Sequence, residues 1–407
     1  MFFGINLAIY NKIIFSKRGE ILVQNILEYA NSIKDVLIND RRTIHQCPEI
    51  GIDLPKTTSY VMKRLKEMGY EPEEITQSGV VATIGQGDKT ILLRADMDAL
   101  PANENTDLPF KSTNDNAHLC GHDMHTAMLL GVAKILKEFE SELKGRVKLM
   151  FQPGEEYALG AKAMVKAGVL DGVDAAMAIH VLADVEPGKM SYTKGICSAS
   201  MSGFDVEIQG KGAHSSTPHL GVDPLMIVNS IYTTLNSLVA KEVDPSETAV
   251  LVVGKMGGGT AMNIIPDTAS ITGGLRCYNP EVDKYLFNRV FEIIDQTTKM
   301  LRGTYTVKLK GTTPSVINDE NLCDTMHPFM EEILGPENIT ILDKPFTGTE
   351  DMSFISEKVP TMLAWLGAGS ADNYPLHNPN VLFNEDALPF GSAVLANCAM
   401  QWLNQYS

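Results

Sequence analysis

The stretch HLCGHDMHTAMLLG at 118–131 places three histidines, one aspartate and one cysteine in its first eight residues, ahead of an apolar run. Thiolate, imidazole and carboxylate groups together suit a borderline divalent ion such as zinc, and cobalt, nickel and manganese accept the same ligand types. Cys120 and His122 stand two residues apart on a predicted loop, so both can face one ion. This stretch therefore predicts part of a metal site, whose other ligands must come from elsewhere in the chain.

Further acidic and imidazole side chains follow predicted strands. Asp96 and Asp98 come at the end of one strand, Glu155 and Glu156 after a second, and His180 at the end of a third. Ligands of open α/β sheets bind at the carboxyl ends of strands, and carboxylates crowded beside histidines repel one another unless a cation is present. A second ion would account for so many ligands. Two ions about 3.5–4 Å apart can activate one water while an uncoordinated carboxylate moves its proton.

Apolar runs that alternate with helical periodicity predict the sheet that positions these groups. The expected strands are 80–85, 90–95, 146–151, 174–181 and 361–367, and the expected helices are 21–40, 57–68 and 126–139. Strands separated by helices indicate an α/β domain.

A different order of elements appears between about 198 and 311. The expected elements are a strand at 204–209, a helix at 223–240, strands at 248–254 and 269–276, a helix at 281–300 and a strand at 304–310. The order βαββαβ is typical of a ferredoxin-like domain. We therefore expect a discontinuous catalytic domain, 1–197 and 312–407, with an inserted domain at 198–311.

Composition excludes several classes of function. A length of 407 residues favours two domains, and a net charge of −16 argues against nucleic acid or an anionic membrane as partner. The six cysteines show no framework spacing, as expected of reduced thiols in a cytoplasmic protein. Residues 1–20 lack a basic start and a cleavage site and are too polar to span a bilayer, so we interpret them as an N-terminal extension.

Ten motifs in order resemble those of the metal-dependent aminoacylase/carboxypeptidase family, in its amidohydrolase branch. That branch includes hippurate hydrolases and hydrolases of indole-acetyl amino-acid conjugates. The motifs are RRTIHQCPEIG (41–51), RADMDALP (94–101), HLCGHDMHTAMLLG (118–131), FQPGEE (151–156), AIHV (178–181), GKGAHSSTPHLGVDP (210–224), NIIPD (263–267), GGLR (273–276), EDMSF (350–354) and PLHNP (375–379). The resemblance covers nearly everything from about Asp40 to the end.

The resemblance implies a zinc-peptidase-like mixed sheet flanked by helices, with an inserted ferredoxin-like domain that serves as lid and dimerisation surface. It also implies a centre of two divalent ions, zinc, manganese, cobalt or nickel, with Cys120 in the bridging position that an aspartate fills in other branches. The implied ligands are Cys120, His122, Glu156, His180 and His377.

The resemblance further implies the catalytic groups. Glu155 matches the general base and acid: the ions polarise the amide carbonyl and lower the pKa of a bridging water, and Glu155 takes its proton and passes it to the departing amine. Asp98 matches the acid that orients a metal ligand or the base, and Asp96 lies nearby as support. The substrate is an N-acyl amino acid or short peptide.

The inserted domain would complete the site. His214 reaches a neighbouring subunit's site to stabilise the oxyanion, and Arg276 holds a substrate carboxylate through its planar fork, with Asn263 as a further substrate contact. We expect a homodimer or a dimer of dimers. His118 and His125 flank the ligands and either contact substrate, support the ligands or serve packing.

Three other functions fit part of the pattern. One is a dipeptidase or carboxypeptidase of the same family. A cysteine hydrolase, with Cys120 as nucleophile helped by His122 or His118, leaves the other ligands unexplained. A metal-stabilised or small-molecule binding module would not need an uncoordinated Glu155. Tyr157-Ala158-Leu159 replaces the family's glycine-rich run after the paired glutamates, which bears on the choice of acyl group.

Overall fold

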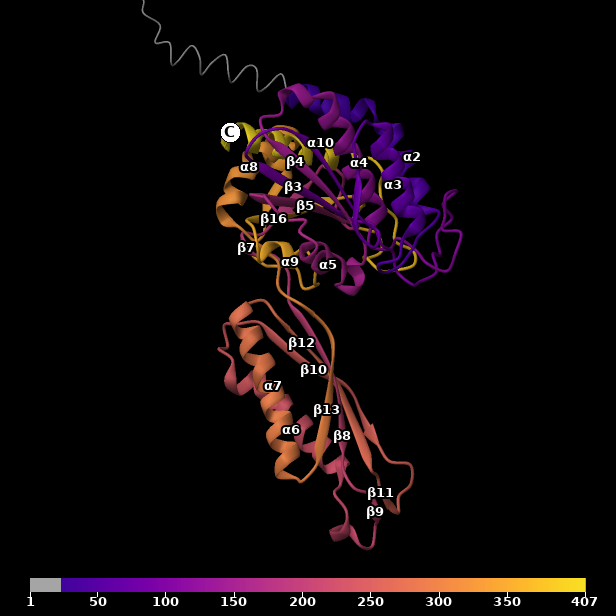
Figure 1. The fold of residues 1–407 in the computed structure, drawn as a ribbon, viewed down its shortest axis with the longest axis vertical. Coiled ribbons are helices and arrows are strands. Elements are labelled where there is room, and N and C mark those ends of the chain that lie inside the picture. The colour runs from indigo at the N-terminus through magenta and orange to yellow at the C-terminus, as the bar shows by residue number, and fades with distance from the viewer. Residues whose placement is uncertain (1–22, 407) are drawn as a thin grey trace, which may run out of the picture. The chain divides into compact units, whose positions relative to one another are not determined.

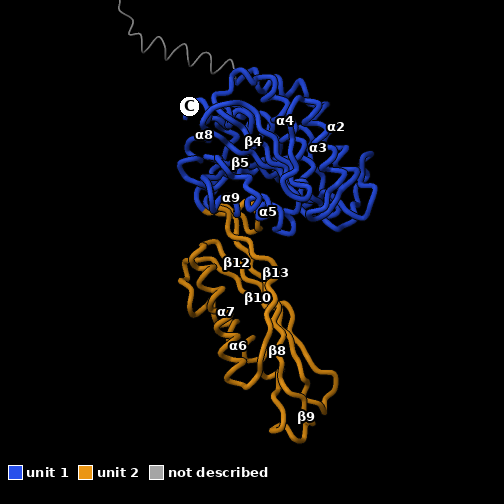
Figure 2. Tube along the Cα trace, in the orientation of Figure 1, with its two compact units in different colours: residues 1–195, 317–343, 354–407 blue, residues 196–316, 344–353 orange. Residues whose placement is uncertain are grey.

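The computed structural model describes residues 23–406, in which the chain divides into two compact units. Unit 2 comprises Ile196–Val316 and Lys344–Ser353, and unit 1 comprises the rest of the described chain (Figure 2). Unit 2 is thus wider than the expected insertion of 198–311. The added segment belongs to it because the Phe346 N–H donates to the Cys197 carbonyl at 2.9 Å. The N-terminal extension predicted at 1–20 lies outside the described residues.

Unit 1 is built on one mixed sheet. Its order is β1 (Glu73–Thr76), β2 (Gly79–Gly85), β4 (Arg146–Gln152), β3 (Thr90–Asp96), β5 (Ala175–Leu182), β16 (Thr361–Gly367), β6 (Met190–Tyr192) and β15 (Ile339–Ile341). The four central strands β4, β3, β5 and β16 run parallel to one another, whereas β2 and β6 on either side of them pair antiparallel. All residues of β3 and β16 are buried, because helices cover both faces of the sheet (Figure 1). This is the predicted mixed sheet flanked by helices.

The helices of unit 1 include residues 23–32, α2 (Lys34–His45), α3 (Pro55–Glu67), α4 (His122–Glu138), α5 (Gly160–Lys166), α8 (Glu320–Leu334) and α10 (Ala387–Tyr406). The short helix α9 (Ser353–Ser356) begins in unit 2 and ends in unit 1. The helix expected at 21–40 is interrupted at Ile33 and continues to His45. The helix expected from Thr126 begins at His122, so that His122 is helical rather than in the loop that we predicted. No helix within 23–406 combines the length and apolarity needed to cross a bilayer.

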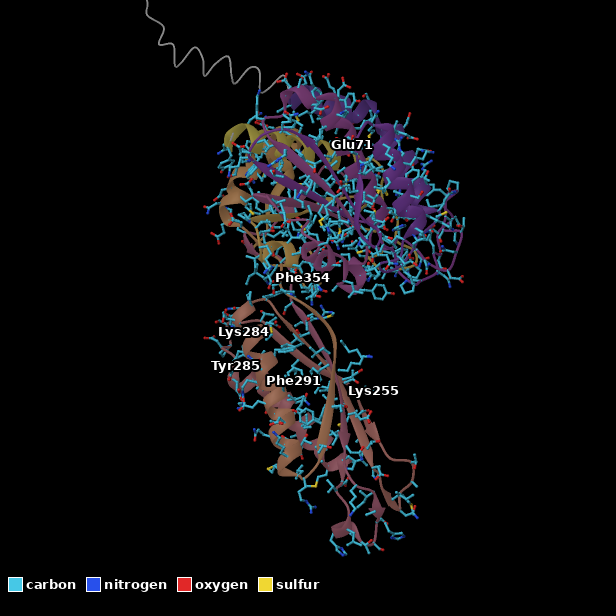
Figure 3. All side chains as sticks on the ribbon, in the orientation of Figure 1. Glu71, Lys255, Lys284, Tyr285, Phe291 and Phe354 are labelled. Carbon is cyan, nitrogen blue, oxygen red and sulfur yellow. The ribbon has the colours of Figure 1, made fainter. Side chains whose placement is uncertain are left out.

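Unit 2 has the predicted order of elements. They are β8 (Met201–Gln209), α6 (Pro224–Glu242), β10 (Ala249–Gly258), β12 (Thr268–Cys277), α7 (Pro280–Met300) and β13 (Thr304–Thr313). The antiparallel sheet has the order β10-β12-β8-β13, and α6 and α7 pack on it. Phe291 on α7, labelled in Figure 3, lies 6.3 Å from Phe204 of β8 between ring centroids. These features confirm a ferredoxin-like fold.

Short elements complete the described chain. They are β7 (Gly195–Ile196), β9 (Ala213–His214), β11 (Ile264–Ile265), β14 (Ile317–Asn318) and the 3-10 turns Glu140–Glu142, Glu155–Tyr157, Pro218–Leu220 and Pro336–Asn338.

A buried ionic network joins α2 to the first turn of α4. Asp123 Oδ2 accepts hydrogen bonds from Arg41 Nε at 2.8 Å and His45 Nδ1 at 2.9 Å, while His45 Nε2 lies 3.2 Å from Glu104 Oε2. Burial opposes the charge on His45, but the hydrogen bonds to Asp123 and Glu104 outweigh it and raise the pKa of His45 to about 9. The network therefore fixes the turn that begins at His122. The four-residue spacing of Arg41 and His45 in RRTIH is the sequence signal for it.

This network predicts a pH-dependent stability. The pKa of His45 rises from 6.5 to about 9 on folding, so its contribution is complete below pH 6.5 and is lost as the pH rises through about 9. We expect His45→Gln to lower the free energy of unfolding by on the order of 3 kcal/mol near pH 6 and by much less near pH 10. Urea unfolding across this range measures the difference. His219→Gln, at an exposed site, is the control, and a pH-independent difference for His45→Gln would contradict the prediction.

Candidate metal centre

The predicted ligands converge because four neighbouring strands are parallel. Their carboxyl ends meet at one edge of the sheet, where ligands bind in α/β folds. The residues delivered there are Asp96 at the end of β3, Asp98 two residues beyond it, Glu155 and Glu156 after β4, His180 from β5 and His377 after β16. Cys120 and His122, just before and at the start of α4, complete the group.

Cys120 lies at the centre of this group. Its Sγ is 3.4 Å from His180 Nε2 and 3.3 Å from His377 Nε2. Two sets of possible metal ligands share it: one adds His122 and His180, the other adds Glu156 and His377, and within each set the ligand atoms lie within 4.8 Å of one another. A thiolate common to two sets is the arrangement that a bridging ligand requires.

Hydrogen bonds select which nitrogen of two histidines is available. The His122 Nδ1–H donates to the carbonyl of Asp98 at 2.9 Å, and the His180 Nδ1–H donates to the carbonyl of Val181 at 2.8 Å. Because carbonyl oxygens only accept, both rings carry their proton on Nδ1. Nε2 of each ring is left with its lone pair, as is usual for histidines that bind a metal.

The donor set fits a divalent cation. His122 Nε2 and Glu156 Oε1 are buried, have no hydrogen-bond partner among the described residues and lie 3.9 Å apart. Such buried polar atoms are costly unless something satisfies both of them, which a cation between them would do. Burial also raises the pKa of the Cys120 thiol, so a thiolate at this position needs a neighbouring positive charge.

Asp98 ties the acidic segment to His122. Its Oδ1 accepts the Glu155 N–H at 3.0 Å and its Oδ2 accepts the Glu156 N–H at 3.2 Å. Its backbone carbonyl is the acceptor for His122, so one residue orients both segments. Burial raises the pKa of Asp98 despite the nearby His122. Glu155 Oε2 lies 3.9 Å from His122 Nε2, at the border of the centre and outside both sets that contain Cys120.

His118 lies beside the buried ionic network of α2 and α4. Its side chain is buried, with 2% of the residue exposed, and its ring centroid is 6.2 Å from that of His45. Burial lowers the pKa of His118 to about 3, so the ring is neutral. Neither ring nitrogen has a hydrogen-bond partner among the described residues, and the substrate contact of His118 stays a prediction.

The predicted residues of the inserted domain fall into two places within unit 2. His214 is exposed on β9, next to Asn263, whose carbonyl accepts the Ser215 N–H at 3.1 Å. Figure 1 shows β9 and β11 at one end of this unit. Arg276, beside Met201 Sδ at 3.8 Å, stands near the far end of β12. From Thr268 to Arg276 the strand advances eight residues at about 3.3 Å each, or about 26 Å.

One supporting residue was not predicted. Arg94 lies in the buried strand β3 and donates from Nη1 to Asp96 Oδ2 at 2.7 Å and from Nε to Gln152 Oε1 at 2.8 Å. The signal was present in the sequence, because a charged residue inside the apolar run TILLRA must have a buried partner.

Gly121 gives a test of the ligand loop. Its φ of 84° is left-handed, and a Cβ there would stand 2.3 Å from Val181 Cγ2. Gly172 has a φ of 71° with nothing within 4 Å of such a Cβ, so it controls for backbone strain, which costs roughly 1–2 kcal/mol at either site. We expect Gly121→Ala to weaken zinc binding in calorimetric titrations and Gly172→Ala to leave it unchanged. Equal affinities for both variants would show that the close approach is unimportant.

Comparisons with known proteins identify the family of this chain. The model of peptidase family M20/M25/M40 matches residues 92–401. The chain is 35% identical to the N-acetyl-L-cysteine deacetylase of Bacillus subtilis (strain 168), covering 92% of this chain and 90% of that protein. It is 34% identical to the hippurate hydrolase of Campylobacter jejuni, covering 94% and 99%.

A solved structure has the same fold and a similar sequence. The YXEP protein of Bacillus subtilis, described as a dinuclear metal binding peptidase, superposes with a TM-score of 0.79 at 29% identity over 92% of this chain and 99% of that one. The chain therefore belongs to peptidase family M20/M25/M40, as its motifs predict.

Proposed function

We propose that this protein hydrolyses the amide bond of N-acyl amino acids or related amino-acid conjugates, with two divalent ions held by Cys120, His122, Glu156, His180 and His377. The observation that carries the proposal is the sharing of Cys120 by two sets of ligands, with Glu155 at their border. Relatives named for deacetylation of N-acetylcysteine and hydrolysis of hippurate support this class of substrate.

The chemistry follows from these positions. When bound, divalent ions polarise an amide carbonyl and lower the pKa of water. Glu155 accepts the proton of the attacking water and returns it to the departing nitrogen. Asp98 holds Glu155 in place through the backbone N–H at 3.0 Å. Arg276 holds the carboxylate of the amino acid, and His214 donates to the oxyanion.

His214 and Arg276 cannot both act from one chain on one small substrate. Strand β12 runs from the end of unit 2 near His214 to the end near Arg276 and spans about 26 Å. An N-acyl amino acid is about two residues long, or about 7 Å. We therefore assign His214 to the site of a second copy, in a homodimer or a dimer of dimers. Asn263 lies next to His214, so we assign it to the same site on the second copy.

A cysteine hydrolase fits the site less well. Cys120 Sγ lies between two imidazole nitrogens, and its burial raises the thiol pKa, whereas a nucleophilic cysteine has a lowered pKa. A cytoplasmic location stays a prediction from the spacing of the six cysteines.

Glu155→Gln tests the assigned base. We expect turnover of N-acetyl, N-benzoyl or indole-acetyl amino acids to fall by at least about 100-fold, because the amide can neither take nor return a proton. Bound metal, measured by elemental analysis, should remain at the wild-type level. Glu186→Gln, at an exposed ion pair with Lys189, is the control. Full turnover by Glu155→Gln would refute the role, and activity that survives complete metal removal would favour Cys120 as nucleophile.

Mixing two inactive variants tests the shared site. A homodimer of Glu155→Gln and one of His214→Ala should each be inactive, whereas mixed dimers carry one site with both groups intact. Random reassociation at equal concentrations should restore about a quarter of the wild-type rate. No recovery, with subunit exchange verified by mass spectrometry, would place His214 in the site of its own chain, and full activity of the His214→Ala homodimer would place it outside the reaction.

A further inference from the structure

We propose that His125 is a positioning residue for the metal centre: its Nε2 accepts the Val181 N–H and so fixes the end of β5 that carries His180. The Val181 N–H lies 2.9 Å from His125 Nε2, and His125 Nδ1 lies 2.6 Å from Asp96 Oδ1. The inference rests on the proposed centre, because it assigns a role toward one of its ligands.

The hydrogen bonds determine which nitrogen of the His125 ring carries the proton. A backbone N–H can only donate, so His125 Nε2 must be unprotonated and accept. The proton of the neutral ring is then on Nδ1, where the Asp96 carboxylate accepts it. Both nitrogens are thereby used, so His125 is neither a metal ligand nor a proton carrier, although it lies within ligand distance of Asp96 and His122.

Val181 needs this acceptor because β5 has lost its partner β3 here, although its pairing with β16 continues through Leu366 opposite Val181. The pairing of β3 with β5 runs from Ile91 opposite Ala175 to Arg94 opposite Ala178 and stops there. Val181 is fully buried, so water cannot replace the missing strand. His125, reaching in from α4, takes the place of the carbonyl that β3 no longer provides.

The fixed backbone in turn orients His180. The His180 Nδ1–H donates to the carbonyl of the same Val181 at 2.8 Å, which aims Nε2 at Cys120. The rings of His125 and His180 are also in contact, edge to face, with centroids 4.6 Å apart. A change in the position of Val181 would therefore move the ligand nitrogen directly.

The other end of His125 is anchored to two further strands. Asp96 of β3 accepts a hydrogen bond from Arg94 at 2.7 Å, and Arg94 donates to Gln152 of β4 at 2.8 Å. A continuous chain of hydrogen bonds thus joins β4, β3, α4 and β5. It couples the strand that precedes the paired glutamates to the strand that carries His180.

Two substitutions of His125 distinguish the loss of the Nε2 acceptor from the loss of ring packing. His125→Gln places an amide oxygen near the position of Nε2 and can still accept the Val181 N–H. His125→Asn reaches only the position of Nδ1, so it keeps the contact with Asp96 and loses the acceptor. Cobalt is the probe, because absorption of Co²⁺ bound by thiolate and imidazole reports coordination without substrate turnover. Titration of each metal-free protein gives stoichiometry and affinity.

We expect the wild type and His125→Gln to bind two Co²⁺ with similar affinity. His125→Asn should bind one of them roughly 10- to 100-fold more weakly, the loss typical when the partner that orients a ligand is removed. Equal binding by all three proteins overturns the proposal. Equal weakening in both variants also overturns it, because ring packing would then be the cause. A wild type that binds no divalent metal refutes the proposed centre itself, so the two failures are distinguishable.

A measurement on the wild-type protein tests the proposal even if His125→Asn does not fold. ¹⁵N chemical shifts of histidine in the metal-free protein identify the protonated nitrogen of each ring, and His125→Gln assigns the signal. The proposal requires a neutral His125 with its proton on Nδ1. A proton on Nε2, or on both nitrogens, is incompatible with the Val181 hydrogen bond and overturns it.

Discussion

The centre of this protein is set by an electrostatic constraint: lone pairs and negative groups are crowded at a largely buried edge of the sheet, where a cation would satisfy them. Cys120, His122 and Glu156 come from distant parts of the sequence, yet their ligand atoms converge within a few ångströms. Uncompensated, such a cluster would be costly because buried polar atoms lose their water. The folding of this edge and the binding of metal are therefore coupled.

Much of the surrounding structure serves to hold that cluster still. The central strands are buried on both faces and bring the ligand-bearing segments to one edge. Asp98 connects His122 to the paired glutamates, and Asp123 connects the first turn of α4 to α2. These acids act mainly as acceptors that fix neighbouring groups, which is why some acidic residues near the centre lie outside the two sets of ligands sharing Cys120.

The sequence predicts β2, β3, β4, β5 and β16 and the order of the inserted domain, because these depend on local periodicity, and the family resemblance supplies the residues proposed for the centre. It does not predict the start of α4 at His122, since Gly121 ends the loop through a left-handed backbone that apolar periodicity does not reveal. The burial of His118 and the pairing of Arg94 with Asp96 also escaped prediction. Both depend on contacts between segments far apart in the chain.

The bridging position proposed for Cys120 would have a further consequence for the protein under oxidative stress. A sulfur atom that serves both sets of ligands can be converted by peroxide to sulfenic or higher acids, a reaction that a carboxylate in the same place would not undergo. One such event would remove a donor from both ions at once. A reductant could restore the thiol only from the sulfenic stage, so deeper oxidation of this one atom would disable the proposed site permanently.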